Sequence, residues 1–408
     1  MTTATAVRER GYSNAGTGFW ASLATAEHVP ELRWPQCLRV YNRMQTDAQV
    51  SSVLQAVAAP IMRTTWSLNG RGVDREVTEN IARSIGLPIK GDDVDTDFSA
   101  QLRGRDRFSW TQHLVEALEH LPVGHSVFEQ VYRYDDQGLA QLRKLGFRPA
   151  HTLSKWNIAD DGGIVSIEQH PRALQPGRTN TGKVTLPVGR LVVYSHGRRG
   201  ADWLGRSVLR ACYKNWILKD DGNRTWAISL QRNGMGVPVH KAGTNNQADI
   251  DAGLEVAAKA RAGDMSGISV GKDGDFGFKG VEGGVTDANA FVRYQDEQIA
   301  RAVLAHFLNL GAQSGSGSYA LGTVQANFFT LSLQAIAEEI RDVANRHIVE
   351  DLVDLNFGPT VPAPRIEFAE IGTSVQAHTA LDKIRADAGL EDDDEMADFI
   401  NNNVAAAA

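Results

Sequence analysis

The most regular pattern in the chain is the helical spacing of apolar residues in three long segments of its second half. Residues 204–234 contain no proline, and Gly222 is the only glycine within 206–233, which predicts a helix of about 45 Å. Residues 287–310 predict a second helix that stops at Gly311, and residues 324–357 predict the longest one. Along this last helix a period near 3.6 is kept by Ile336, Ile340, Val343, Ile348, Leu352 and Leu355.

The first half of the chain mixes helical spacing with the alternation typical of strands. Its predicted helices are 39–60, where Pro60 ends the pattern, 77–86 and 109–123. Residues 126–134 and 139–150 alternate on either side of a DDQG turn and predict a β-hairpin. Further short strands are predicted at 63–68, 164–170, 183–188, 190–197 and 364–371. Residues 35–200 therefore predict one mixed α/β domain.

Two segments between the long helices differ from their surroundings. Residues 235–286 are rich in glycine and predict a compact insert with one helix at 248–263 and two short strands within 267–280. Residues 311–328 contain no charged side chain, and their glycines keep many backbone conformations open. This second segment is longer and less polar than a turn between helices requires.

Composition narrows the class of protein. A length of 408 residues predicts two or three domains, and 42% hydrophobic residues are enough for folded cores. A net charge of -7 argues against a protein that grips nucleic acid over its whole surface, because such proteins carry a basic excess. The two cysteines, Cys37 and Cys212, fit a reducing compartment. No apolar run reaches the ~20 residues of a membrane span and the N-terminus does not resemble a signal peptide, so we expect action or assembly in a cytosol.

One motif points weakly toward an enzyme. Residues 177–184 have the G-x-x-x-x-G-K spacing of a phosphate-binding loop, in which Lys183 would reach the phosphate. Val184 stands where Ser or Thr would hold Mg²⁺, and a strand is predicted next instead of the helix that the site needs. We therefore interpret this segment as a loop between two strands.

Other candidate chemistry is weaker still. Ser269 lies in a G-x-S-x-G match, but no helix is predicted after it, as a nucleophile elbow requires. The acidic run 391–395 lacks the ligand spacing of a calcium loop, and the eleven histidines show no metal-binding spacing. The sequence therefore predicts no catalytic residue, no cofactor and no metal site.

A basic edge is predicted on the helix at 204–234. Arg206, Arg210 and Lys214 are spaced by four residues, and they are joined by Lys219, Arg224 and Arg232. One interpretation is a solvated surface with charges paired to nearby acids such as Asp220. The other is a helix that faces phosphate groups.

The order of these elements resembles the portal proteins of tailed bacteriophages, and most closely the Mu-like branch common in actinobacterial phages. The resemblance covers about residues 35–360, through stretches such as PVGHSVFEQVYR, LGRSVLRACYKNWILKDDGNRTWAISLQRNGMGVPV and DEQIARAVLAHFLNLGAQSGSGSYALG. It implies an α+β portal fold with a mixed α/β wing, long stem helices, a small α/β clip, a tunnel loop and a helical C-terminal crown. The implied parts are a flexible arm at 1–34, wing at 35–203, stem helices at 204–234 and 287–310, clip at 235–286, tunnel loop at 311–328, long wing helix and return strand at 329–372, and crown at 373–408.

The resemblance also implies a function. Portal proteins form a ring, typically of twelve copies, at one vertex of the capsid in the virion. Double-stranded DNA passes through the ring during packaging and ejection, and the ring docks the large terminase and later the head–tail adaptor. Contacts with the major capsid and scaffolding proteins, assembly in the host bacterial cytoplasm, and no enzymatic activity, cofactor or membrane contact are expected accordingly.

Site residues follow from this resemblance and from elementary electrostatics. Each phosphate that a cation neutralises firmly opposes the sliding of DNA, so an uncharged tunnel loop suits a conduit. The candidates are Gln313, Ser314, Ser316, Ser318 and Tyr319 in the tunnel loop, Arg206, Arg210 and Lys214 on the stem, and Ile268, Val270, Phe276 and Phe278 in the clip. The stem cations are expected near the channel or against acids of the neighbouring subunit, and the short clip strands are expected to pair across subunits.

Two alternatives stay open from the sequence. One is another ring-forming virion protein, such as an adaptor. The other is a nucleotide-hydrolysing enzyme that uses the loop 177–184 and Lys183.

Overall fold

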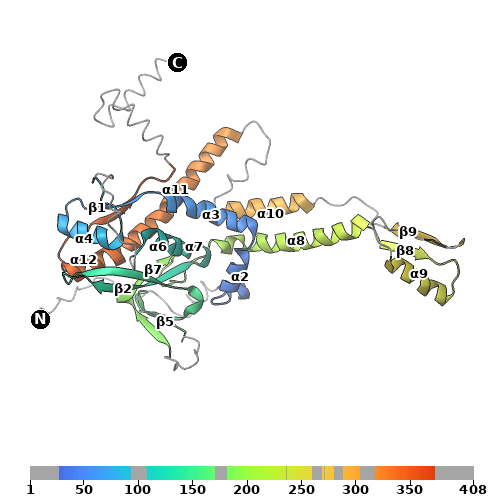
Figure 1. Cartoon of the computed structure of the whole chain (residues 1–408), viewed down its shortest axis with the longest axis horizontal. Helices are drawn as coiled ribbons and strands as arrows, with labels where there is room; N and C mark the ends of the chain where they lie inside the picture. The colour runs from blue at the N-terminus through green and yellow to red at the C-terminus, as the bar shows by residue number, and fades with distance from the viewer. Residues whose placement is uncertain are drawn as a thin grey trace, which may run out of the picture. The chain divides into compact units, whose positions relative to one another are not determined.

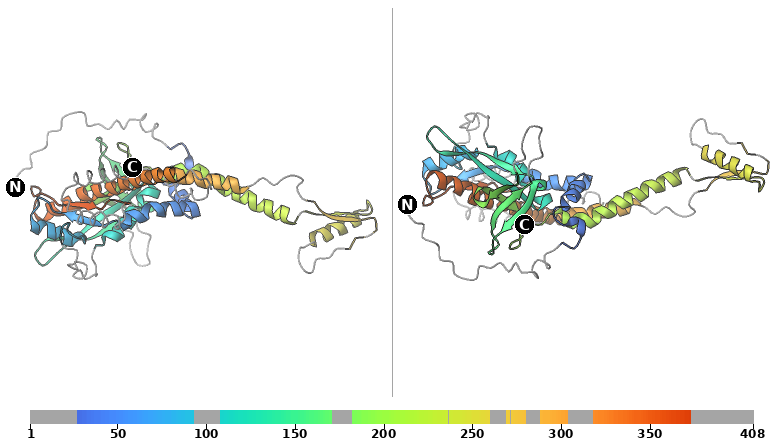
Figure 2. Two further views of the ribbon diagram at one scale, coloured as in Figure 1. Left: turned by 90° about the horizontal axis from the view of Figure 1, so that it is seen from above. Right: turned by 90° about the horizontal axis from the view of Figure 1, so that it is seen from below.

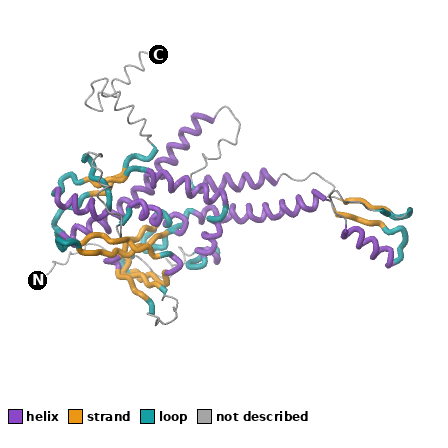
Figure 3. The backbone as a smooth tube through the Cα atoms, viewed as in Figure 1, coloured by secondary structure: helices purple, strands orange, loops and turns teal. Residues whose placement is uncertain are grey.

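The computed structural model of the chain describes residues 27–92, 108–170, 182–235, 237–259, 269–270, 272–279, 288–303 and 318–372. The fold is α+β, with helices and strands both well represented (Figure 3). The chain divides into two compact units: unit 1 is Met1–Arg210 with Leu310–Ala408, and unit 2 is Ala211–Asn309. Among the described residues, no helix is long and apolar enough to cross a membrane.

Unit 1 contains three small antiparallel sheets (Figure 1). The first has the order β3-β2-β7, with strands β2 (His125–Tyr134), β3 (Ala140–Arg148) and β7 (Leu191–Ser195). The second has the order β4-β5-β6, with strands β4 (Leu153–Ile158), β5 (Ile164–Gln169) and β6 (Val184–Pro187). In the third, β1 (Trp66–Asn69) pairs with β10 (Arg365–Phe368), which joins segments nearly 300 residues apart. The predicted hairpin at 126–150 is confirmed as β2 and β3.

Helices surround these sheets. The α-helices of unit 1 are α2 (Cys37–Met44), α3 (Ala48–Arg63), α4 (Arg75–Ile85), α6 (Trp110–Ala117), α7 (His120–Val123), α11 (Ser318–Ala344) and α12 (Glu350–Asn356). A π-helical turn, Asn345–Val349, joins α11 to α12, and short 3₁₀ turns lie at Pro30–Leu32, Ala150–Thr152 and Val188–Arg190. Helix α11 lies against β7 and α3.

The core of unit 1 explains why the alternating and helical patterns were strong there. Seven buried residues form a cluster shared by the two three-stranded sheets: Val127, Leu153, Ile164, Ile167, Leu186, Leu191 and Val193. Helix α11 buries one stripe at helical spacing, made of Phe329, Leu333, Ala337, Ile340 and Ala344. Each fully buried Leu or Ile stabilises the fold by about 1.5–3 kcal/mol, so this packing fixes how α11 lies on the sheet.

One predicted helix of unit 1 is wrong in its boundaries. Residues 39–60 form two helices instead of one, because the Asp47 carboxylate caps α3 by accepting hydrogen bonds from Gln49 N and Val50 N at 2.9 and 3.2 Å. Pro60 does not end α3, which continues to Arg63. The last turn persists because Ile61 is fully buried and Pro60 O accepts the N–H of Thr64 at 3.1 Å.

Unit 2 is built from two long helices and a small insert between them in sequence. Its elements are α8 (Leu209–Met235), β8 (Val237–Lys241), α9 (Gln247–Lys259), β9 (Asp275–Lys279) and α10 (Ala288–Ala302). Helices α8 and α10 run side by side in the views of Figures 1 and 2. Strands β8 and β9 pair antiparallel, and α9 packs against β8.

Candidate functional site

Arg206 does not belong to the long helix that the sequence predicted to carry it. Helix α8 begins at Leu209, and Ser207 Oγ accepts the N–H of Leu209 at 3.0 Å while donating to Pro122 O at 2.6 Å. Gly205 has a φ of +64°, which an L side chain rarely adopts and which turns the chain before the helix. The prediction of one basic edge through Arg206, Arg210 and Lys214 is therefore wrong at its first member.

Arg210 is neutralised within its own chain. Its Nε and Nη2 donate to the two carboxylate oxygens of Glu27 at 2.6 and 2.9 Å. This fork lowers the pKa of the Glu27 carboxyl and raises the pKa of the Arg210 guanidinium, in both cases chiefly through the shared hydrogen bonds. The pair also ties the segment at Glu27 to the start of α8, since Val29 N donates to Glu27 Oε1 at 3.0 Å.

Two further cations of α8, Lys214 and Lys219, differ in their surroundings. Lys214 is exposed. Lys219 is buried, with Nζ 2.7 Å from Asp296 Oδ1 of α10, so it joins the two long helices instead of facing solvent. Gly222 allows the same approach, because a Cβ there would lie 2.7 Å from the ring of Phe291.

The small insert of unit 2 leaves much apolar surface in contact with solvent. Phe276 and Phe278 meet edge to face with ring centroids 5.5 Å apart, and the side chain of Phe278 is 57% exposed. Helix α9 approaches β8 so closely that a Cβ on Gly253 would lie 2.3 Å from the His240 ring, yet Leu254 beside it is 70% exposed. The insert therefore buries one face of α9 and exposes apolar residues elsewhere.

The predicted clip strands differ in part from the observed ones. Phe276 and Phe278 lie in β9 as expected, and β9 pairs with β8 of the same chain. Val270 is exposed and lies outside the strands, and Ile268 lies outside the described residues. Pairing between subunits stays a prediction for the two outer edges of this two-stranded sheet.

The predicted tunnel loop at 311–328 is wrong over its second part. Helix α11 begins at Ser318, so Ser318 and Tyr319 open a helix, whereas Gln313, Ser314 and Ser316 lie outside the described residues. The reason is composition: between 318 and 328 there is no proline and one glycine, Gly322, while Ala320, Leu321 and Ala326 favour a helix. The part of the predicted loop that precedes α11 is 311–317, which lies outside the described residues.

The described structure does not support the two candidate enzyme motifs, the loop 177–184 and the match around Ser269. Lys183 is exposed and lies 3.4 Å from Glu168, and strand β6 begins at Val184 where a phosphate loop would need a helix. Ser269 is exposed, and residues 275–279 after it form a strand. Residues 177–181 and 391–395 lie outside the described part of the chain.

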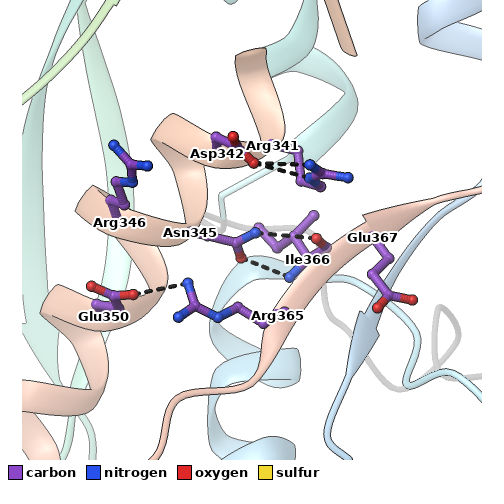
Figure 4. A pocket seen from close by; sticks show the side chains of 8 residues that line it. All are labelled: Arg341, Asp342, Asn345, Arg346, Glu350, Arg365, Ile366 and Glu367. Carbon is purple, nitrogen blue, oxygen red and sulfur yellow. Dashed lines mark hydrogen bonds and ion pairs between the residues drawn. The ribbon is translucent and has the colours of Figure 1, made fainter. Parts of the chain in front are cut away.

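A charged groove at the π-helical turn was not found from the sequence (Figure 4). It has a volume of about 570 Å³ and is lined by Arg341, Asp342, Asn345, Arg346, Glu350, Arg365, Ile366 and Glu367. The Asn345 amide spans the Ile366 backbone, accepting from Ile366 N at 2.7 Å and donating to Ile366 O at 3.2 Å. These bonds satisfy the edge of β10 that β1 does not cover.

The groove balances its charges. Arg365 Nη1 lies 2.8 Å from Glu350, and Arg341 Nη2 lies 3.0 Å from Asp342. Hydrogen bonds from Lys90 and Asn69 lower the pKa of Glu367. Three guanidinium groups and three carboxylates therefore line the groove, and neither sign of charge is in excess. No local motif could reveal it, because its two walls are about 20 residues apart in sequence and meet only where β10 packs against the π-helical turn.

The two units together define a class of protein. One is a mixed α/β unit, and in the other a small insert of two strands and a helix lies between two long helices in the sequence. The family model of the portal protein of Mu bacteriophage matches residues 38–401. The chain therefore belongs to this family, and it is a portal protein. None of the curated proteins matches the chain in sequence.

Solved structures show the same fold. The neck of the empty gene transfer agent particle, computed with C6 symmetry, contains a chain with a TM-score of 0.58 at 12% identity, covering 92% of this chain and 95% of that chain. The neck of the native particle, computed with C12 symmetry, contains one with a TM-score of 0.54 at 12% identity, with the same coverage of 92% and 95%. An HK97-family phage portal protein from Corynebacterium diphtheriae matches with a TM-score of 0.44 at 14% identity over 84% of this chain and 96% of that one, a likeness too weak to bear on the fold.

Proposed function

We propose that copies of this chain form the portal ring at one vertex of a tailed-bacteriophage capsid, with double-stranded DNA passing through its axis during packaging and ejection. The observation that carries the proposal is the family match over residues 38–401. A ring of twelve copies is supported by the similar chain in a particle neck computed with C12 symmetry. The protein is then a structural component of the virion, assembled in the host bacterial cytoplasm.

The portal parts are proposed as follows. Helices α8 and α10 are the stem, the insert between them is the clip, and most of unit 1 is the wing. The crown is proposed for 373–408, and the tunnel loop is narrowed from 311–328 to the part that precedes α11. The 27 residues of α8 give a rod of about 40 Å, which is long enough to line a channel around a duplex.

The tunnel segment is proposed to let DNA slide. Residues 311–317 include Gln313, Ser314 and Ser316 and no charged side chain, so the segment offers DNA no firm ion pair. Ser316→Lys in every subunit should slow DNA passage, as measured by packaging rate in a motor assay. The control Ser52→Lys places the same charge on an exposed position of α3. Equal packaging rates for the two variants would show that the segment is a passive spacer.

The stem cations are proposed to act singly. Arg210 is paired with Glu27 of its own chain. We therefore expect Arg206 and Lys214, which are both exposed, to be the stem cations that face the channel or the neighbouring subunit. Lys214→Glu should change the rate of DNA packaging or the yield of assembled rings. If neither the rate nor the yield changes, the Lys214 side chain only contacts solvent.

The clip is proposed as a contact between subunits. Val270, Phe276 and Phe278 belong to an insert whose apolar residues are poorly covered within one chain, including Leu254 and Ile250 on α9. Exposed apolar surface on a small module is typical of a protein–protein contact. A clip that folds and stays monomeric when expressed alone would contradict this assignment.

The partners are proposed from the same function: the large terminase during packaging, the head–tail adaptor afterwards, and the major capsid and scaffolding proteins during assembly. No enzymatic step is proposed for this chain. Electron microscopy of the purified protein is the direct test, and rings with a central channel are expected. Monomers under all assembly conditions would overturn the proposal.

A further inference from the structure

Unit 1 brings together two histidines and a glutamate that no sequence spacing connects. His120 opens α7, His196 follows β7 directly, and Glu339 lies on α11. Glu339 Oε2 lies 4.0 Å from His120 Nε2 and 3.6 Å from His196 Nδ1, and one ligand atom of each residue falls within 4.8 Å of the others. We propose that these three side chains bind one divalent transition-metal ion of the zinc type.

The histidine tautomer supports this proposal. His120 is fully buried, and its Nδ1 lies 2.7 Å from Ala117 O, which can only accept. Nδ1 therefore carries the proton, and Nε2 presents its lone pair to Glu339 and His196. A histidine that ligates zinc typically donates its other N–H to a carbonyl in this way.

The nitrogen atoms that face the cluster have no hydrogen-bond partner among the described residues. His120 Nε2 and His196 Nδ1 are both buried atoms without one. A buried polar atom left unsatisfied costs about 1–3 kcal/mol, so two of them pointing at one carboxylate need an explanation. A cation between them satisfies both lone pairs and the carboxylate at once.

The backbone holds this arrangement in place. His196 N donates to Gly124 O at 2.9 Å, and Arg206 N donates to His196 O at 2.8 Å. Gly124 has a φ of +106°, and a Cβ on it would lie 2.6 Å from Leu204 O, so the segment at 204–207 can approach the end of α7 this closely only because residue 124 is glycine. The backbone of His196 is thus held beside the end of α7 before any ligand binds.

The donor set indicates the chemistry. Two imidazole nitrogens with one carboxylate oxygen suit zinc and its neighbours in the first transition row. Two ligands at zinc distance in a tetrahedron lie about 3.3 Å apart, whereas the present ligand atoms lie within 4.8 Å of one another, so binding requires a small shift of the imidazole rings as well as of Glu339, which is 30% exposed. The partial exposure of His196 and Glu339 leaves a fourth position for water. Such an ion would fasten α11, the long helix that starts after the tunnel segment, to α7 and the end of β7.

The test uses full-length tag-free protein, freed of metal by a chelator and titrated with ZnCl₂ by calorimetry. We expect one zinc per chain and a rise in Tm of roughly 5 °C at saturating metal. Co²⁺ should give the visible d–d bands of a nitrogen and oxygen site without a thiolate band. His196→Gln and Glu339→Gln should each weaken zinc binding by ~100-fold, while the neighbours Glu338→Gln and the exposed His170→Gln should leave it unchanged.

Both variants alter partly exposed side chains, so we expect the variant proteins to stay folded. Circular dichroism and the Tm of the metal-free proteins check that weaker zinc binding is not caused by unfolding. No stoichiometric zinc binding by the wild-type chain would overturn the proposal and leave a His–Glu cluster without a metal ion. Zinc binding that survives both His196→Gln and Glu339→Gln would overturn it as well, because the ion would then lie elsewhere.

Discussion

The core of unit 1 and the small insert of unit 2 differ in how far they bury their apolar residues. In unit 1, Ile340 of α11 is fully buried beneath the sheet, whereas in unit 2 Leu254 of α9 is 70% exposed. Both residues lie on amphipathic helices. The difference teaches that unit 1 covers its apolar helix face within one chain, while the insert of unit 2 leaves apolar surface exposed, as a surface for a protein–protein contact would.

The sharpest way to break this comparison is a matched pair of truncations. Ile340→Ala should lower the free energy of unfolding by about 3 kcal/mol, because it leaves a cavity in a core that cannot collapse. Leu254→Ala should change it by less than about 0.5 kcal/mol, because the side chain is already solvated. Urea denaturation of dissociated protein measures both, and equal effects would mean that the two regions are not built differently.

The edge of β10 gives the next largest effect within unit 1. Asn345→Ala should cost about 2–3 kcal/mol, because it leaves the buried N–H and C=O of Ile366 without their partners. Asn345→Asp is the sharper control, since a carboxylate can still accept from Ile366 N but cannot donate to Ile366 O. In the same urea denaturation, the free energy of unfolding should be highest for the wild type, lower for Asn345→Asp and lowest for Asn345→Ala. An unchanged free energy of unfolding for Asn345→Ala would mean that Asn345 does not stabilise the edge of β10.

Acid should weaken unit 1 through its buried histidines. Burial lowers the pKa of His113 to about 3 and that of His125 to about 4, so both are neutral in the folded chain. Below the ordinary histidine pKa the unfolded chain binds more protons, so stability present above pH 6.5 is lost as the pH falls toward 4, by about 1 kcal/mol per pH unit for each residue.

Unfolding free energies at pH 7, 6 and 5 measure this slope. His113→Gln should flatten it, while His170→Gln, which removes an exposed imidazole, should not. A slope that is the same in both variants would assign the acid sensitivity to other groups.

A substitution in the insert of unit 2 should have the smallest effect on folding and the clearest effect on ring assembly. Phe278→Ala removes a ring that is 57% exposed, so the unfolding free energy should barely change. If the clip joins subunits, the concentration needed for ring assembly should rise about tenfold, as mass photometry can measure. Val165→Ala, which truncates an exposed residue of unit 1, is the control. Rings that assemble equally well in both variants would mean that Phe278 faces solvent in the virion.

The sequence was most informative where local patterns decide the structure. The hairpin β2–β3 followed from alternation around a turn, and α4 from its amphipathic spacing and the left-handed Gly86 at its end. Predictions failed where a single cap or contact decided a boundary. Asp47 splits one apolar pattern into α2 and α3, and Gly205 with Ser207 delays the start of α8.

The candidate surfaces show the same division. The exposure of Phe278 could be guessed from the weak apolar content of the insert, but the burial of Lys219 could not, because Asp296 approaches it only when α8 and α10 pack together. Likewise, the Glu27 partner of Arg210 is 183 residues away in the chain.

By itself, the sequence determined the α+β class, the order of long helices and insert, and the absence of charge in residues 311–317, since these depend on periodicity and composition. Only the tertiary structure decided which charges are neutralised, which apolar residues stay exposed, and that His120, His196 and Glu339 meet. The physical reason is that burial and pairing depend on distances through space, and residues 76 and 143 positions apart become neighbours only when α7, β7 and α11 pack around one core.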